Sequence, residues 1–479
     1  MVPVIFLFVV LIVSTVSVSF SSISSNTTVS TTGSVVYFPQ IQVTMNFTRM
    51  IGVNNLSLGF QLDGRDISYW KGSSTARDLS KDANFKLVRF FYHRLGQPCT
   101  RWSEETKTGS WSWTNIDDLT NKIFAINAEP LIVLGFAKFD GSGLSGLPSG
   151  MSSDPITKLP DPDQWAAYCA DWVEHFENEG MDVVYYEIIN ESHHYFEWGG
   201  TNTARRGYFK DLFNAAAVAM RAINPKIKLG NDNSMVQSNN LDKWFATNLE
   251  PLDFLSWHGY ITGNKGESDS SLIDKAQTDE GATYGPSDFI DPARQNYYDE
   301  NGVWLPVIQS EANLNYAYSG GTDPRIQQML GGVYVALWTR MLILKGTVSH
   351  NIFFDFGGSG ASDTKFGMVN KDDDEPWYPY YTHYMVGGIG NLCVGDTVVE
   401  STSSSNDIVL LAWKHGNKIN ILLINTVTGN RTVELEGVSG TFDWWKIDNS
   451  EFDLQNGTID VANSIALSGY TVMLLQISE

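Results

Sequence analysis

Two glutamates at the ends of apolar runs are the residues of this chain best suited to chemistry. Glu191 closes the run 183–191, and Glu311 closes the run 305–311. Both runs have the length and composition of short buried strands, where a carboxylate is costly to bury unless it has a partner or a chemical task. Two such carboxylates on separate strands of one sheet are the minimum for cleaving a glycosidic bond. One gives a proton, and the other attacks the sugar or activates water.

Polar side chains in two other apolar runs are candidates to surround the glutamates. Arg89 lies within the run 87–91, so it requires a carboxylate partner. His258 and Tyr260 are two residues apart and therefore share one face of a strand. We expect this face to form a wall of a sugar site. The alternative is that His258 is a buried imidazole held by a backbone group.

Four further residues are candidates because they stand close to the glutamates in the sequence. Asn190 directly precedes Glu191, and Asn313 follows Glu311 by two residues. His193 and Trp198 follow Glu191 and would line the cleft from a loop. The alternatives are that His193 covers the loop and that Trp198 packs in the core, which is the commoner fate of a single tryptophan.

The order of apolar runs between residues 50 and 385 predicts the fold that positions these residues. Short strand-like runs alternate with helix-length patterns. The expected strands are 57–60, 87–91, 130–134, 183–189, 227–229, 254–258, 306–309 and 351–354, and the expected helices include 116–126, 163–179, 206–223 and an amphipathic 324–344. This alternation predicts an α/β fold, the (β/α)8 TIM barrel, in which function lies at the C-terminal ends of the strands. Glu191 then ends strand four, and Glu311 ends strand seven.

The chain changes character after residue 385. Only strand-length patterns and turn signals remain, which predicts that 386–479 is an antiparallel β-sandwich domain. The segment 35–45 also alternates, so it is either an extra strand of this sandwich or a loosely ordered linker. We therefore expect a catalytic barrel over 50–385, preceded by a Ser/Thr-rich linker and possible sandwich strand over 26–49.

The N-terminal segment predicts export. Residues 2–13 are almost wholly apolar, a Ser/Thr-rich stretch follows, and the first basic residue is Arg49. We expect 1–25 to be a signal peptide, with a retained signal-anchor as the alternative. The protein would then be secreted or extracellular, and in the alternative case anchored to the outer face of the membrane.

Composition narrows the classes of partner. The 479 residues include 54 Asp and Glu but only 32 Lys and Arg, a formal charge of -22, which excludes a basic nucleic-acid footprint. Cys99, Cys169 and Cys393 show no metal-binding spacing, and both one disulfide plus a thiol and three free thiols stay open. We expect no cofactor and no metal. The sequence does not indicate the oligomeric state.

Five short motifs follow one another along the chain in a recognisable order. They are Leu87-Val88-Arg89-Phe90, Ile189-Asn190-Glu191, the segment 252–260 that ends in His258-Gly259-Tyr260, Ser310-Glu311-Ala312-Asn313, and Phe366-Gly367-Met368-Val369-Asn370. Together they resemble the clan A retaining glycoside hydrolases, and most closely the β-xylosidase/α-iduronidase-like family. The resemblance covers most of residues 50–479, barrel and sandwich together.

The resemblance implies a role for each matching residue. Glu191 would be the acid/base and Glu311 the nucleophile, while Asn190 would hold the sugar 2-hydroxyl and Arg89 would support the nucleophile. The chain departs from the family pattern at three places. Ser192 replaces the usual Pro, Phe91 stands where many members have His, and strand eight ends in Phe353-Phe354-Asp355 rather than in Trp.

We expect a secreted retaining glycoside hydrolase that acts by double displacement. Its carbohydrate substrate would be a β-linked polysaccharide or oligosaccharide of plant or microbial type, cleaved in the manner of an endo-glucanase or xylanase. One alternative is an exo-acting β-xylosidase or iduronidase-like enzyme. Another is a non-catalytic carbohydrate-binding surface protein, although binding alone does not require Glu191, Glu311 and Asn190 together.

Overall fold

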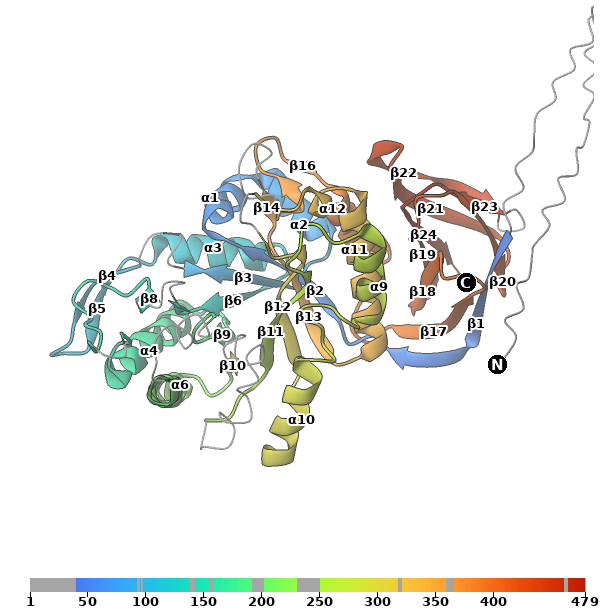
Figure 1. Ribbon diagram of the computed structural model, residues 1–479. Helices are drawn as coiled ribbons and strands as arrows, with labels where there is room; N and C mark the ends of the chain where they lie inside the picture. Colours follow the sequence, from blue (N-terminus) through green and yellow to red (C-terminus); the bar gives the residue numbers. More distant parts are fainter. Residues whose placement is uncertain are drawn as a thin grey trace, which may run out of the picture.

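The computed structural model places two sheets side by side, with helices around and between them (Figure 1). It describes residues 40–92, 95, 98–137, 143–155, 158–191, 202–230, 250–317, 321–358, 366–460 and 464–478. The segment 1–39, His193 and Trp198 therefore lie outside the described residues.

The first sheet is a parallel barrel, as predicted. Its strands are β2 (Ser57–Leu62), β3 (Leu87–Phe91), β6 (Glu129–Val133), β9 (Tyr185–Glu187), β10 (Lys228–Gly230), β11 (Leu255–Thr262), β12 (Val307–Asn315) and β13 (Val348–Phe353). They pair in the order β10-β9-β6-β3-β2-β13-β12-β11. A parallel bridge between Gly230 and Phe254 closes the ring. The prediction of a (β/α)8 fold is confirmed.

The interior of the barrel changes from apolar to polar along the strands. One layer is a purely apolar cluster of Leu87, Leu131, Tyr185, Phe254, Ile308 and Ile352. Alternate residues of a strand point to the same face, so the next interior layer lies two residues further on. Four of these positions are buried polar or charged residues, namely Arg89, Glu187, Ser256 and Ser310. The site is therefore built on top of a packed apolar base.

Helices cover the outside of the barrel. They are α1 (Gly64–Gly72), α2 (Ser74–Asp82), α3 (Thr114–Ala125), α4 (Pro162–Glu179), α6 (Asn202–Ile223), α9 (Asp269–Thr278), α10 (Ile290–Asn301), α11 (Met329–Lys345) and α12 (Tyr378–His383), with π-helical turn η3 (Tyr384–Ile389). In α4, the Asp161 side chain accepts hydrogen bonds from two amides of the first turn, and Gly180 ends the helix in the left-handed region. These end signals explain why the sequence predicted this helix well.

The segment 324–344 differs from its prediction as one amphipathic helix. A short 3-10 turn, η2 (Pro324–Ile326), precedes α11, and Gln328 between them is extended with ψ 177°. The Asp323 side chain holds the turn by accepting from the Arg325 amide. Helix α11 is buried on nearly all sides rather than on one face, because it lies between the barrel and the second sheet (Figure 1).

Short pairs of strands decorate the loops of the barrel. The first hairpin is β4 (Cys99–Ser103) with β5 (Thr108–Trp111), and the second is β7 (Phe136–Ala137) with β8 (Leu144–Ser145). A small sheet of β14 (Gly357–Gly358), β15 (Val369–Asn370) and β16 (Glu375–Pro376) follows the last barrel strand.

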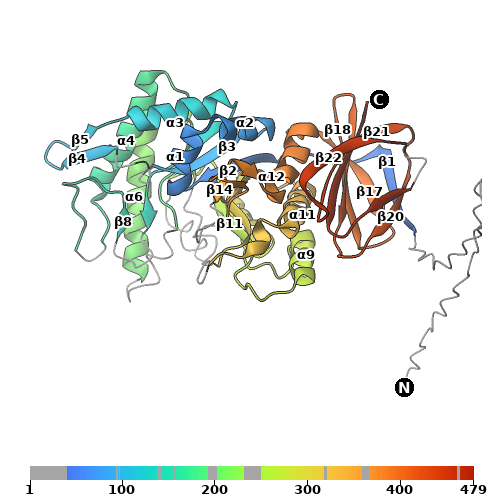
Figure 2. The same cartoon turned by 90° about the horizontal axis from the view of Figure 1, so that it is seen from above.

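The second domain confirms the predicted β-sandwich, and its strands belong to one sheet that curls on itself around an enclosed core (Figures 1 and 2). Its strands are β1 (Gln40–Val53), β17 (Thr397–Ser403), β18 (Ile408–His415), β19 (Lys418–Asn425), β20 (Arg431–Glu436), β21 (Thr441–Asp448), β22 (Glu451–Asp460), β23 (Ile465–Leu467) and β24 (Thr471–Ser478). The order is β22-β21-β24-β19-β18-β17-β1-β20-β23. One pair, β1 with β20, is parallel. Strand β1 precedes the barrel in the sequence, so no hairpin joins it to β20 and forces the two strands to be antiparallel.

The two faces of the curled sheet pack into two different cores. Leu423 and Leu475 point into the core that the sheet encloses. Their neighbours Leu422 and Leu474 belong to the large cluster that also contains the residues of α11 and the barrel. Central strands buried on both faces read as continuous apolar runs. The barrel and the curled sheet therefore share one hydrophobic core.

The state of the cysteines and the character of the helices are also defined. Cys99, Cys169 and Cys393 are all free thiols, and the first two are buried. Among the described residues, the helices are too short or too polar to span a bilayer.

Candidate active site

Glu191 and Glu311 face each other at the C-terminal end of the barrel strands. Glu191 follows β9 by four residues, and Glu311 lies within β12. One oxygen of each carboxylate and one ring nitrogen of His258 all lie within 4.8 Å of one another. Residues 120 positions apart in the sequence are thus brought to a single point.

A β-bulge turns Glu311 into the barrel. Trp257 pairs with Gln309, but the next residue, His258, pairs with Glu311, so Ser310 is the extra residue of β12. In an unbroken strand Ser310 would face inward and Glu311 outward. Here the Ser310 hydroxyl bonds Ser256 at 2.6 Å inside the barrel, and Glu311 also points inward. The bulge therefore places two successive side chains on the same face.

The backbone at Glu191 is held in an uncommon conformation. The Asn190 amide donates to the Gly135 carbonyl at 2.7 Å, which ties this segment to the neighbouring barrel strand. Glu191 itself has φ 52°, in the left-handed region that few residues other than glycine adopt. This turn directs the carboxylate back over the barrel mouth. Its side chain keeps 18% of its surface exposed.

Glu311 is surrounded by hydrogen-bond donors. Arg89 Nη1 lies 2.9 Å from one carboxylate oxygen, and the Tyr260 hydroxyl donates to the other at 2.8 Å. His258 Nδ1 lies 3.3 Å from the second oxygen. Burial raises the pKa of the Glu311 carboxyl and the charge of Glu191 adds to this, while His258, Arg89 and Tyr260 act in the opposite direction.

Arg89 joins the two glutamates to the polar layer beneath them. Its Nε and Nη2 atoms donate to one oxygen of Glu187 at 2.9 and 2.7 Å, and it also donates to Gln61 and Asn190. The guanidinium is fully buried. Burial alone would lower its pKa, but the charges of Glu187 and Glu311 outweigh that and raise it. Arg89 is therefore a permanent cation beneath the site.

His258 lies between the two glutamates. Its Nδ1 atom is 3.1 Å from Glu191 Oε1 and 3.3 Å from Glu311 Oε2. Tyr260 stands on the same face of β11, so the structure places both residues on the expected wall. Two of the contacts of His258 are therefore with carboxylates.

Asn313 is committed to the backbone rather than to the space between the glutamates. Its amide nitrogen donates to the carbonyls of Phe354 and Phe366, and its oxygen accepts from the Leu314 amide at 2.6 Å. It joins the end of β13 to the segment after residue 365. Asn313 therefore holds together two backbone segments at the rim of the site.

Sequence reasoning overlooked part of the network. Glu187 is buried completely and accepts from both Arg89 and the Ser256 hydroxyl. Gln61 accepts from Arg89 at the end of β2. The signal for Glu187 was present, because a carboxylate inside an apolar run is as costly to bury there as at Glu191. The hydroxyls of Ser256 and Ser310 carried no such signal.

The same groups could in principle ligate a cation. One ligand atom comes from each of Glu191, His258 and Glu311, and these three atoms lie within 4.8 Å of one another. However, the Arg89 guanidinium already lies 2.9 Å from Glu311 and repels a second positive charge. The electrostatics favour a Glu311 carboxylate paired with Arg89 over a metal ligand.

Family comparison places most of the barrel in one group of enzymes. The sequence model described as "Glycosyl hydrolases family 39" matches residues 41–336, which is more than half of the chain. Curated protein sequences provide no match.

Solved structures match over nearly the whole length of the chain. A monomeric β-xylosidase from Caulobacter crescentus CB15 has a TM-score of 0.63 at 13% identity, covering 91% of this chain and 99% of that one. The GH39 enzyme from Xanthomonas axonopodis pv. citri gives 0.63 at 14%, covering 91% and 97%. A GH30 endoxylanase from Clostridium papyrosolvens C71 gives 0.57 at 14%, covering 92% and 100%. At these identities the likeness shows the fold alone.

Proposed function

The chain belongs to glycosyl hydrolases family 39 and is a glycoside hydrolase, and from this premise we propose that it cleaves β-glycosidic bonds with retention of configuration. Glu311 is the nucleophile and Glu191 is the acid/base. The substrate is a β-linked oligosaccharide or polysaccharide, and neither step requires a metal.

The separation of the two carboxylates carries this proposal. Retaining enzymes hold them roughly 5–5.5 Å apart, whereas inverting enzymes leave roughly 6.5–9.5 Å for a water molecule. Oxygen atoms of Glu191 and Glu311 lie within 4.8 Å. One nitrogen of His258 contacts both carboxylates, at 3.1 and 3.3 Å. This closeness supports the retaining geometry, in which Glu311 attacks the sugar directly.

In the first step, a Glu311 oxygen attacks the anomeric carbon and the glycosidic C–O bond breaks. Glu191 gives its proton to the departing oxygen, which leaves as an alcohol. The proximity of anionic Glu311 favours the protonated form of Glu191 before reaction. Arg89 and Tyr260 keep Glu311 ionised and oriented for the attack.

In the second step, water cleaves the glycosyl–Glu311 ester. Once Glu311 is esterified it has lost its charge, so Glu191 is free to act as a base. It takes one proton from water, the hydroxide attacks the anomeric carbon, and the Glu311 carboxylate leaves. Arg89 and Tyr260 then stabilise the charge that returns to Glu311.

Exo-acting removal of single sugars is the second candidate. It is supported by the likeness to β-xylosidases. Besides the enzyme described above, a second structure of a β-xylosidase from Caulobacter crescentus matches this chain over its whole length, at 14% identity. Endo action is supported by the likeness to a bifunctional glucanase-xylanase from a metagenome library, covered to 99%. Products from xylo-oligosaccharides separate the two, because exo action releases only single sugars at early times.

Azide rescue tests the assigned roles. With an activated aryl β-glycoside, Glu191→Ala should lose about 10²–10⁴-fold in rate and regain it with azide, giving the β-glycosyl azide. Glu311→Ala should instead give the α-glycosyl azide, because azide replaces the nucleophile. The control is Glu174→Ala on the exposed face of α4, which should keep full activity.

Two results would contradict the proposal. Exchange of the two azide products between the variants would reverse the assigned roles. A wild-type protein that binds β-glycans but never cleaves any of a broad panel of β-glycosides would instead support the alternative of a carbohydrate-binding surface protein.

We propose separately that the apolar segment 2–13 directs export. Its length and its Ser/Thr-rich continuation support a signal peptide. Full-length protein expressed in a secreting host should reach the medium with an N-terminus near residue 25. A product that stays in the membrane fraction with residue 1 intact would indicate the signal-anchor instead.

A further inference from the structure

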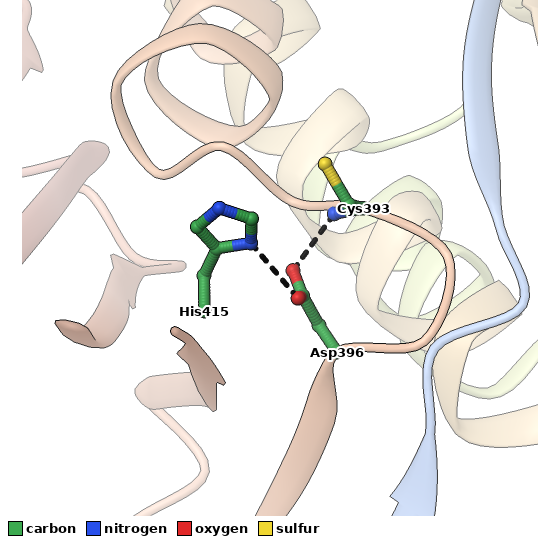
Figure 3. A group of neighbouring side chains, drawn as sticks. All are labelled: Cys393, Asp396 and His415. Atoms are coloured by element: carbon green, nitrogen blue, oxygen red, sulfur yellow. Dashed lines mark hydrogen bonds and ion pairs between the residues drawn. The ribbon is translucent and has the colours of Figure 1, made fainter. Parts of the chain in front are cut away.

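A second group of metal-ligating side chains lies far from the barrel mouth, where the chain passes from barrel to curled sheet. Cys393, Asp396 and His415 each offer one ligand atom, and the three atoms lie within 4.8 Å of one another. Asp396 stands between the other two (Figure 3). Its Oδ1 is 2.9 Å from His415 Nδ1, and its Oδ2 accepts from the Cys393 amide at 2.8 Å.

We propose that Cys393, Asp396 and His415 bind one transition-metal ion of the zinc class. A thiolate, an imidazole nitrogen and a carboxylate oxygen form a ligand set that suits Zn²⁺ and Co²⁺ rather than Ca²⁺ or Mg²⁺. The site is independent of the glycosidase chemistry, and its role is to join the two domains.

A tight backbone turn and the register of two strands present these ligands. The Asp396 amide donates to the Cys393 carbonyl, which closes a tight turn, and Gly395 supplies the positive φ of 99° at its third position. Thr397 at the start of β17 pairs with Lys414 of β18. The register therefore sets Asp396 opposite His415, 19 residues apart in the sequence but adjacent across the sheet.

The ligand atoms are close to the distances that a tetrahedral ion requires. Bond lengths of about 2.0 Å to nitrogen and oxygen and about 2.3 Å to sulfur imply ligand-to-ligand distances of roughly 3.3–3.6 Å. The His415–Asp396 pair at 2.9 Å must open slightly, and Cys393 Sγ, within 4.8 Å, must approach. Both changes require rotation about side-chain bonds.

Two asparagines support the site. Asn391 contacts His415 Nε2 through its side chain and thereby fixes the ring, the role that outer groups play around metal-bound histidines. Its Oδ1 accepts from Cys393 Sγ at 3.7 Å and so holds the thiol beside the site. Asn54 donates to the Cys393 carbonyl at 2.9 Å.

The position of the site explains what an ion would do there. The chain crosses between the domains twice in this region, at residues 54–56 and 390–396, and the Asn54 amide bonds the Asp396 carbonyl at 2.8 Å. An ion held by Asp396, Cys393 and His415 would link the turn between the domains to strand β18. His415 keeps 30% of its side chain exposed, so an ion can enter from solvent.

Cobalt binding to the chelator-treated full-length protein tests the proposal. We expect one equivalent of Co²⁺ per chain, with the sulfur-to-cobalt charge-transfer band that marks a thiolate ligand. Zn²⁺ should displace it and raise Tm by roughly 3 °C at 100 times the Kd. Cys393→Ser and His415→Ala should abolish the band, and the matched control Val394→Ala, an exposed residue of the same turn, should keep it.

Alkylation provides a readout that needs no variant. Iodoacetamide should modify half-buried Cys393 in the metal-free protein, and Zn²⁺ should protect it, while buried Cys99 and Cys169 stay unmodified in both states. A wild-type protein without the charge-transfer band, a band that survives in Cys393→Ser, or alkylation of Cys393 at an unchanged rate with Zn²⁺ would each overturn the proposal.

Discussion

At the scale of single residues, the site is governed by how buried charges are compensated. Arg89 is fully buried, and it lies within 3 Å of both Glu187 and Glu311. Removing one partner of such a pair costs roughly 3–5 kcal/mol, because it leaves an uncompensated buried charge. The network therefore fixes the geometry of Glu311, and Arg89 acts against the burial that raises the pKa of its carboxyl.

The Tyr260 hydroxyl should set the acidic limit of activity. Burial raises the pKa of Glu311, and the Tyr260 hydrogen bond lowers it. In the proposed mechanism Glu311 must be ionised to attack, so activity is lost as the pH falls through its pKa. Tyr260→Phe removes a donor to the charged form, and the acidic limb of kcat/KM should move about one pH unit upward.

The neighbouring ring offers a matched control for this pH shift. Tyr316 packs edge-on against Tyr260, with ring centroids 5.8 Å apart, and is 41% exposed. Tyr316→Phe should leave the pH profile of kcat/KM in place. An acidic limb that does not move in Tyr260→Phe would show that this hydroxyl does not stabilise the carboxylate.

Site residues could be predicted from the sequence mainly where burying the side chain costs free energy. Glu191, Glu311 and Arg89 stand out because a charge inside an apolar run needs a partner. Asn313 and the serines of the polar layer do not stand out, since a neutral polar group finds partners almost anywhere. The contacts of Asn313 with Phe354 and Phe366 depend on tertiary packing, which no local pattern encodes.

At the scale of elements, the site depends on the register between β11 and β12. The bulge at Ser310 lets His258 and Glu311 meet, and Gln309 holds the two strands together just before it. The Gln309 side chain donates to the Gly259 carbonyl at 3.1 Å and accepts from the Trp338 indole at 2.9 Å. Helix α11 thus supports the strands that carry the chemistry.

Gly259→Ala should disturb this register. A Cβ at Gly259 would lie 1.9 Å from Gln309 Nε2 and 2.8 Å from Trp257 Cζ2. The crowding should lower the free energy of unfolding by about 1–3 kcal/mol. It should also reduce kcat/KM by about 10–100-fold, because small displacements of reacting groups are costly. Urea unfolding and steady-state kinetics measure the two effects.

Gly52→Ala is the control for added bulk in a strand. Its Cβ would meet nothing within 4 Å, so stability and activity should stay close to those of the wild type. If Gly259→Ala were equally silent, the Gln309 contacts would not be what maintains the pairing of β11 with β12.

Elements were predictable from sequence where their local signals agree. The caps of α4 and the apolar run of β3 gave their positions closely. The bulge in β12 was not predictable, because it reflects pairing with β11 rather than the composition of β12. The break before α11 was missed for a related reason, since the run 324–344 has helical character throughout but Gln328 is extended.

At the scale of the whole molecule, both ends of the chain build the curled sheet. Strand β1 pairs antiparallel with β17 on one side and parallel with β20 on the other. It is therefore an internal strand, although it precedes the barrel in sequence. Alternation in the segment 35–45 had suggested such a strand, but neither its partners nor its parallel pairing could be read from one segment alone.

Removing β1 should therefore damage the domain at the opposite end of the chain. A protein that starts at Asn54 leaves β17 and β20 with unpaired edges and removes Ile41, Val43 and Met45 from the enclosed core. Each lost large side chain costs about 2–5 kcal/mol, and exposed edges promote aggregation. We expect a marked fall in Tm with strong binding of an apolar dye. Since the barrel and the sheet share one core, glycosidase activity should be lost in the same thermal transition. The matched control starts at Gln40 and should behave as the full-length protein does. A chain starting at Asn54 with unchanged Tm would show that β20 and β23 remain folded without β1.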